Sequence, residues 1–101
     1  MTVPADVAAY VRRSFAEGDR EPALLCLAEA VDHLGHPVGP RLMRAAAVAA
    51  RGDPAKLAYY IGLLKQDWRD VIVAGEYEVG DRRLVRVRDL TQPIPGPADR
   101  H

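Results

Sequence analysis

The sequence has few of the residues that mark disulfide-bonded, catalytic or nucleic-acid-binding domains. It contains one cysteine, Cys26, and one serine, Ser14, and its fourteen basic residues balance fourteen acidic ones. A single cysteine excludes an intramolecular disulfide and is typical of a reducing compartment. Balanced charge gives no overall field that would draw the chain to nucleic acid or to an anionic membrane.

Long apolar runs and an N-terminal leader are also absent. No run reaches the roughly 18 residues that a membrane helix needs, and no positive segment followed by an apolar core opens the chain. The length of 101 residues, with 49% hydrophobic and 28% charged side chains, is ordinary for one globular domain. We therefore expect a soluble protein of the cytoplasm that does not insert into membranes.

Glycine, proline and aspartate divide the first two-thirds of the chain into helix-sized pieces. Gly18 and Gly52 are each able to end a helix in the left-handed conformation. The aspartates that follow them, Asp19 and Asp53, are placed to cap the next helix. Pro54 suits a first helical position because its missing N–H costs nothing there. The predicted helices cover residues 3–17, 19–35, 40–51 and 54 onward.

The Gly-Asp pair recurs after 34 residues (52 − 18), a period that indicates repeated helical hairpins. The segment "RAAAVAARGDPAKLAYYIGLLKQD" resembles a tetratricopeptide repeat, and "AAYVRRSFAEGDREPALLCLAEAV" resembles one more weakly. Both lack that family's first-helix tryptophan, its Leu-Gly pair and its closing proline. The resemblance covers about residues 4–68 and implies stacked antiparallel helical hairpins. A plain four-helix bundle is the alternative.

Two such hairpins leave an apolar end face that something must cover. The stretch "DWRDVIVAGEYE", residues 67–78, is suited to a capping helix. Asp67 would cap it, while the residues of one apolar stripe would face inward: Trp68, Val71, Ile72 and Gly75. One continuous helix over residues 54–76 is also compatible with the sequence.

Residues 80–101 have a different character. Val85 and Val87 alternate with Arg86 and Arg88, which is the period of a strand. A turn at Gly80-Asp81 would close a hairpin, which would need to lie on the helices because a lone hairpin is marginal in water. The end, "TQPIPGPADRH", predicts an extended tail. The expected fold is all-α, with a helical domain over residues 1–79 and an extended or hairpin arm over residues 80–101.

The densest group of charges beside aromatic residues is the candidate site. Aromatic residues and arginine dominate binding hot spots, so this group predicts a partner-binding surface with Trp68 and Tyr77 as anchors. The charged residues beside them, Arg69, Asp70 and Glu76, are expected to face water. The plainer interpretation is a helix start with its usual acids. The stretch is also similar to a D-[WY]-R-D-V…E-Y ending of small uncharacterised bacterial proteins, a similarity that implies no activity.

Other candidate chemistry is weak. Asp32, His33 and His36 do not have the spacing of a metal site, and Cys26 is expected in the core. Neither a nucleophile elbow nor a phosphate-binding or dinucleotide-binding loop is present, so we expect no enzyme, metal or cofactor. Four arginines crowd one segment: Arg82, Arg83, Arg86 and Arg88. The acidic residues beside them neutralise the charge of this segment.

The sequence therefore predicts a non-catalytic protein–protein interaction module, either an adaptor or a neutralising partner such as a toxin immunity protein. The second idea is an analogy from size and class. Stacked hairpins would also offer a concave surface lined by their first helices, residues 3–17 and 40–51. The alternative function is a nucleic-acid accessory protein that uses the arginine-rich arm. The partner's identity and the oligomeric state do not follow from the sequence.

Overall fold

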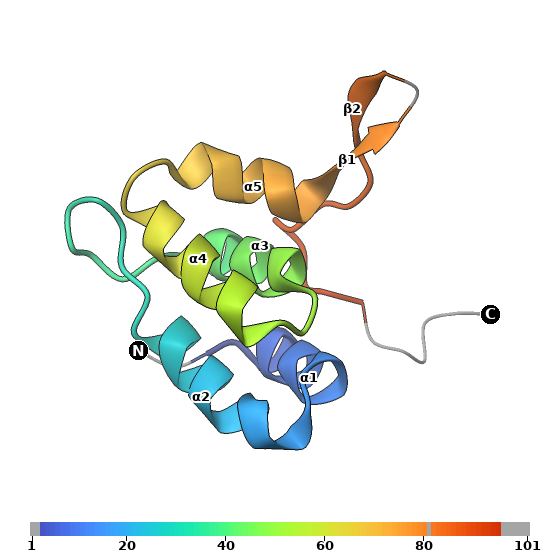
Figure 1. The fold of residues 1–101 in the computed structure, drawn as a ribbon. Coiled ribbons are helices and arrows are strands. Elements are labelled where there is room, and N and C mark those ends of the chain that lie inside the picture. Colours follow the sequence, from blue (N-terminus) through green and yellow to red (C-terminus); the bar gives the residue numbers. More distant parts are fainter. Residues whose placement is uncertain (1–2, 81, 96–101) are drawn as a thin grey trace.

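The computed structural model describes residues 3–80 and 82–95, and its five helices stack in three tiers (Figure 1). The fold is mostly helical, as predicted, but it is not all-α because the arm forms a two-stranded antiparallel sheet. The elements are α1 (Ala5–Ser14), α2 (Glu17–Ala28), α3 (Pro40–Ala50), α4 (Pro54–Leu64), α5 (Trp68–Glu76), β1 (Tyr77–Gly80) and β2 (Arg83–Arg86). Among the described residues, no helix combines the length and the apolar character that crossing a membrane requires.

The tiers are the α1–α2 hairpin, the α3–α4 hairpin and α5. Helix α3 packs against both α1 and α5, while α2 packs against α4. Helix α5 covers the end face of the second hairpin (Figure 1). The resemblance to tetratricopeptide repeats stays a prediction.

Helix α3 lies at the centre of the core because its side chains are small. Residues 45–50 are all buried, and five of these six are alanines. A Cβ atom on Gly75 of α5 would lie 2.7 Å from the Cα of Ala45 and 2.8 Å from its carbonyl oxygen. The backbones of α3 and α5 therefore touch, and only glycine fits at this point of α5.

The predicted starts of α4 and α5 are confirmed. The Asp53 carboxylate accepts hydrogen bonds from the N–H groups of Ala55 and Lys56, and Gly52 adopts a φ of 81° in the turn before it. The Asp67 carboxylate accepts one from Arg69 N–H. This second cap divides residues 54–76 into two helices, so the continuous helix is excluded.

The predicted boundary between the first two helices is wrong. Helix α1 ends at Ser14, and Phe15, which is 2% exposed, turns into the core in an extended conformation. Helix α2 begins at Glu17, so Gly18 and Asp19 lie in its first turn. Burial of the large Phe15 side chain therefore decides where the first helix ends, and the Gly18-Asp19 pair does not.

The end of α2 also differs, since the helix stops at Ala28 and not at Gly35. The Asp32 carboxylate accepts hydrogen bonds from the N–H groups of Leu34 and His36. Gly35 adopts a φ of 82° inside this turn. An aspartate side chain that bonds nearby backbone in this way competes with the helix.

The described tail beyond the hairpin forms neither helix nor strand, turns at residues 89–92, and is partly core. Leu90 is 1% exposed and Ile94 is 9% exposed. Ile94 N–H donates to the Asp6 carboxylate at 2.9 Å, and Arg44 donates both to Asp6 and to the carbonyl oxygen of Leu90. The surface of α1 and α3 that we considered for a partner therefore holds the chain's own tail. Residues 96–101 lie outside the described part.

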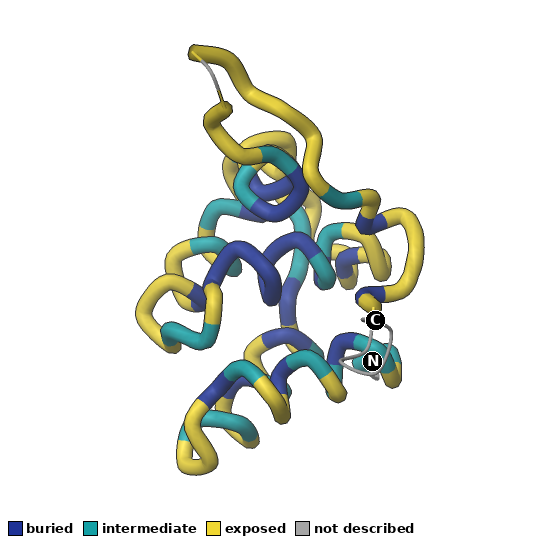
Figure 2. Tube along the Cα trace, turned by 90° about the vertical axis from the view of Figure 1, so that its right-hand side faces the viewer, coloured by how far each residue is buried: buried dark blue, intermediate teal, exposed yellow. Residues whose placement is uncertain are grey.

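The hairpin does form, but the prediction that it lies on the helices is wrong. It projects beyond α5, and most of its residues are exposed (Figures 1 and 2). Gly80 pairs with Arg83, so Gly80 is the last residue of β1 and not a turn residue as predicted. Arg82 has a φ of 67°, and Asp81 lies outside the described residues.

The contact between α3 and α5 predicts opposite effects for two glycine substitutions. Gly75→Ala forces a methyl group onto the Ala45 backbone, and we expect it to lower the free energy of unfolding by about 2 kcal/mol or more. Gly62→Ala in α4 meets no atom within 4 Å and should raise it by about 0.5–1 kcal/mol through helix propensity. Urea titrations measure both; equal effects at the two sites would contradict this account of the packing.

Candidate functional site

Trp68 is the first residue of α5. It was predicted to be buried, and that prediction is wrong. Its relative exposure is 43%, whereas Val71, Ile72 and Gly75 of the same helix do turn inward. The cap at Asp67 starts a new helix at this point, so the ring is not carried on the apolar stripe of α4. Trp68 is therefore available at the surface.

The Trp68 ring forms one wall of a pocket of about 260 Å³, which we call the Trp68 pocket. Residues from three regions of the chain line it: Asp32, His33, Arg41, Leu42, Trp68 and Ile72. The loop that follows α2 supplies the first two, the start of α3 the next two, and α5 the last two. The pocket combines an apolar wall with a cationic guanidinium at its edge.

Arg69 and Asp70 face water, as predicted. The guanidinium carbon of Arg69 lies 5.7 Å from the centre of the Trp68 ring, within the range of a cation–π contact. Arg69 also lies 3.8 Å from the Asp67 carboxylate, with its side chain 79% exposed. This pair contributes little to folding, since exposed ion pairs are worth about 0–1 kcal/mol.

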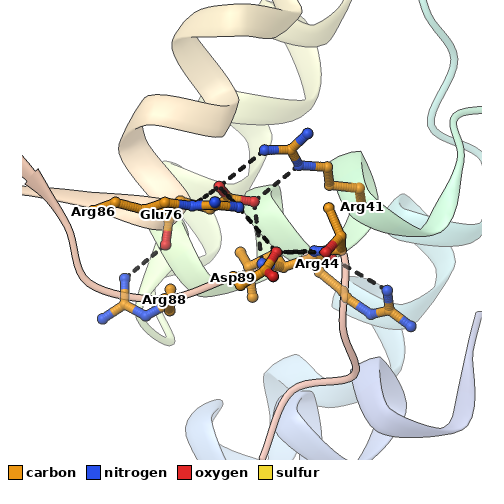
Figure 3. Close-up of polar contacts among 9 residues, drawn as sticks. Arg41, Arg44, Glu76, Arg86, Arg88 and Asp89 are labelled. Atoms are coloured by element: carbon orange, nitrogen blue, oxygen red, sulfur yellow. Dashed lines mark hydrogen bonds and ion pairs between the residues drawn. The ribbon is translucent and has the colours of Figure 1, made fainter.

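Glu76 does not face water, and the prediction that it lies on the binding surface beside Arg69 is wrong. It is 0% exposed and is the buried charged residue of the described core. Arg41 donates to its two carboxylate oxygens at 2.9 and 3.0 Å. Arg86 donates to it at 3.0 Å, and Leu90 N–H at 3.1 Å (Figure 3). We call these four residues the Glu76 cluster.

The pKa of Glu76 follows from a balance inside this cluster. Burial acts to raise the pKa of Glu76, but the hydrogen bonds from Arg41 and Leu90 N–H, together with the charges of Arg41 and Arg86, hold it below its ordinary value. The same hydrogen bond raises the pKa of Arg41. Glu76 is thus an ionised structural carboxylate with its hydrogen bonds satisfied.

The predicted site residues therefore divide between the two ends of α5. Trp68, Arg69 and Asp70 lie at its start, while Glu76 and Tyr77 lie at its end, where Tyr77 pairs with Arg86 in the hairpin. Sequence reasoning missed Arg41, Leu42 and His33, which complete the Trp68 pocket. No local signal marks them, because the fold brings them from a loop and another helix.

The remaining candidates are the metal-ligating side chains and the thiol. His33 and His36 are exposed in the loop after α2, and the described residues contain no group of three metal-ligating side chains. Cys26 is exposed on α2, so its predicted place in the core is wrong. A second hollow of about 390 Å³ lies between α3, α4 and α5. Three alanines line it together with Arg51, Lys56, Tyr59 and Tyr60.

The Glu76 cluster predicts a pH-dependent contribution to stability. Because the folded pKa lies below the ordinary 4.5, this contribution is complete above about pH 5 and is lost as the pH falls through the folded pKa. Glu76→Gln should lower the free energy of unfolding by about 2–3 kcal/mol at pH 7, the range for hydrogen bonds to charged groups. The variant should also lose less stability than the parent chain between pH 6 and pH 3.

Glu78→Gln is the matched control. Glu78 also pairs with arginines, at 3.3 Å from Arg88 and 3.5 Å from Arg51, but its side chain is 47% exposed. Its loss should change the free energy of unfolding by no more than about 1 kcal/mol. Urea titrations at several pH values test both; an equally small effect of Glu76→Gln would remove the cluster's structural role.

Comparison of this chain with protein-family models, with curated proteins and with solved structures finds no match.

Proposed function

We propose that this chain is a non-catalytic protein that binds another protein through the Trp68 pocket. The observation that carries the proposal is the half-exposed Trp68 ring on the wall of a surface pocket. Tryptophan is the residue type most enriched where binding energy concentrates. Folding leaves a large part of this ring uncovered, so its burial by a partner would stabilise a complex.

The size of the pocket favours a side chain of a protein over a free metabolite. Sites for drug-sized molecules enclose about 300–1,000 Å³, and the Trp68 pocket is about 260 Å³. Leu42 and Ile72 extend the apolar wall. A single large apolar side chain of a partner suits such a space.

The charges at the rim of the pocket are already engaged within the chain. Arg41 reaches the pocket with its side chain 43% exposed, although it also binds Glu76. Asp32 already accepts two backbone hydrogen bonds within its own loop. The apolar wall is therefore the main feature that a partner would bind. Both an adaptor and a neutralising partner of a toxin would use a surface of this kind.

Nucleic-acid binding through the arginine-rich arm is the less supported function. Arg86 pairs with Glu76 and Asp89, and Arg88 pairs with Glu78. Two of the four arginines are thus neutralised within the chain. No aromatic side chain lies between them to stack on a base.

The proposal predicts that Trp68→Ala weakens binding of the partner while the protein stays folded. Truncation of a fully buried aromatic residue costs about 3–5 kcal/mol. For this half-exposed ring we expect a loss of about 1–2 kcal/mol in the free energy of unfolding. Affinity for the partner should fall at least tenfold, which corresponds to about 1.4 kcal/mol.

Tyr59→Ala is the matched control, because Tyr59 is a 63% exposed aromatic residue on α4, beside the other hollow. Parent chain and variants would capture partners from extracts of the source cell. Calorimetry with the captured protein, once purified, would then give affinities. The proposal expects equal binding by the parent and Tyr59→Ala chains. A partner that Trp68→Ala binds as tightly as the parent would refute it, as would the absence of any partner for the folded parent.

A further inference from the structure

The hairpin is another part of the described surface where folding leaves apolar side chains uncovered. Its exposed apolar side chains are Val79 (80%), Leu84 (54%), Val85 (40%) and Val87 (46%). Cross-strand partners share a face of the sheet, so Val79 with Leu84 lie on one face and Val85 lies on the other. The tube in Figure 2 shows the hairpin standing clear of the helices. Within the described residues, each strand has only the other as a hydrogen-bonded neighbour.

The base of the hairpin is held firmly by polar contacts. The carbonyl oxygen of Glu76 accepts hydrogen bonds from Val87 N–H at 2.7 Å and Arg88 N–H at 3.3 Å. Arg88 also donates to the carbonyl oxygen of Gly75 at 2.6 Å. These contacts fix the direction in which the strands leave α5. The strands beyond them form a pre-oriented template with open edges.

A two-stranded sheet of this kind is marginal in water, and a third strand is what usually stabilises it. Addition of an extended segment to an open sheet edge is a common mode of peptide recognition. The backbone groups of the edge supply the affinity, and the side chains supply the selectivity. The charges on β2 therefore decide which segment fits.

A second copy of this chain does not fit the edge of β2. Antiparallel pairing of two β2 strands about their centre places Arg83 of each opposite Arg86 of the other. Like charges directly opposite each other destabilise a sheet. Arginines on an edge strand discourage self-association for this reason.

An acidic strand does fit. Arg83 forms no ion pair with any described residue, and the same is true of Arg82 in the loop. Glu78 on β1, in contrast, is already paired with Arg51 and Arg88. The unused positive charge thus lies at the tip, on the side of β2.

We propose that the edge of β2 binds an extended strand of a partner protein, antiparallel to β2, with acidic residues beside Arg82 and Arg83 and apolar residues beside Leu84 and Val85. This site is separate from the Trp68 pocket and does not depend on it. The two lie at opposite ends of the nine-residue helix α5, about 13 Å apart along its axis. A chain with both sites would join two protein segments at a fixed distance.

The test is an NMR titration of the full chain with a peptide, acetyl-Thr-Thr-Val-Val-Glu-Glu-amide. Antiparallel to β2, its glutamates lie at the tip of the hairpin. We expect shifts and slower amide exchange for residues 83–87 at millimolar peptide. Arg83→Glu should weaken this binding about tenfold and should strengthen binding of the same peptide ending in two lysines by a similar factor. Arg12→Glu, at an exposed position of α1, is the control and should leave both affinities unchanged.

Other results would overturn the proposal. Shifts confined to the Trp68 pocket, equal binding of the two peptides, or no binding at millimolar peptide would each do so. A dimer of the parent chain in sedimentation, lost in Leu84→Asp, would make a second copy the occupant. Binding of a single-stranded DNA oligonucleotide that Arg83→Glu abolishes, without binding of the acidic peptide, would make the hairpin a nucleic-acid arm. Circular dichroism checks that each variant keeps its helices.

Discussion

One buried carboxylate ties the peripheral parts of this fold to its helical centre. Glu76 ends α5, and its two oxygens bind Arg41 at the start of α3, Arg86 on β2 and the backbone of Leu90 in the tail (Figure 3). Seven of the eight strand residues of the hairpin are exposed, so these charged hydrogen bonds help to set where it points. Removal of one partner from a buried charged group is costly because the others lose their compensation. The cluster thus links the helical core to the two segments that follow it.

The parts of the fold that were predicted from the sequence are those fixed by local interactions. Asp53 and Asp67 cap helices through N–H groups two or three residues away, and the alanines of α3 permit a close neighbour wherever that neighbour comes from. The end of α1 and the end of α2 were not predicted. Burial of Phe15 decides the first, and the turn around Asp32 decides the second; in both cases a side chain competes with the helical pattern.

The candidate site shows the same division. Trp68 was predicted as a site residue, but its exposure follows from the break between α4 and α5. Glu76 lies four residues after Ile72, so the helical period alone places it on the inward stripe. Its charge argued for water, and the compensating arginines are 35 residues before it and 10 residues after it. Ion pairs between residues so far apart in sequence cannot be predicted without the fold.

The hydrogen bond from Ile94 to Asp6 joins residues 88 positions apart. The hairpins α1–α2 and α3–α4, in contrast, are built from neighbours in sequence. Contacts of low sequence separation form fast, and closure of a long loop comes later because its entropic cost must be met first. The order of folding follows: the helical tiers assemble early, and the tail closes over α1 and α3 as a last step. During synthesis the chain therefore passes through a state in which the apolar surface that Ile94 covers is still open.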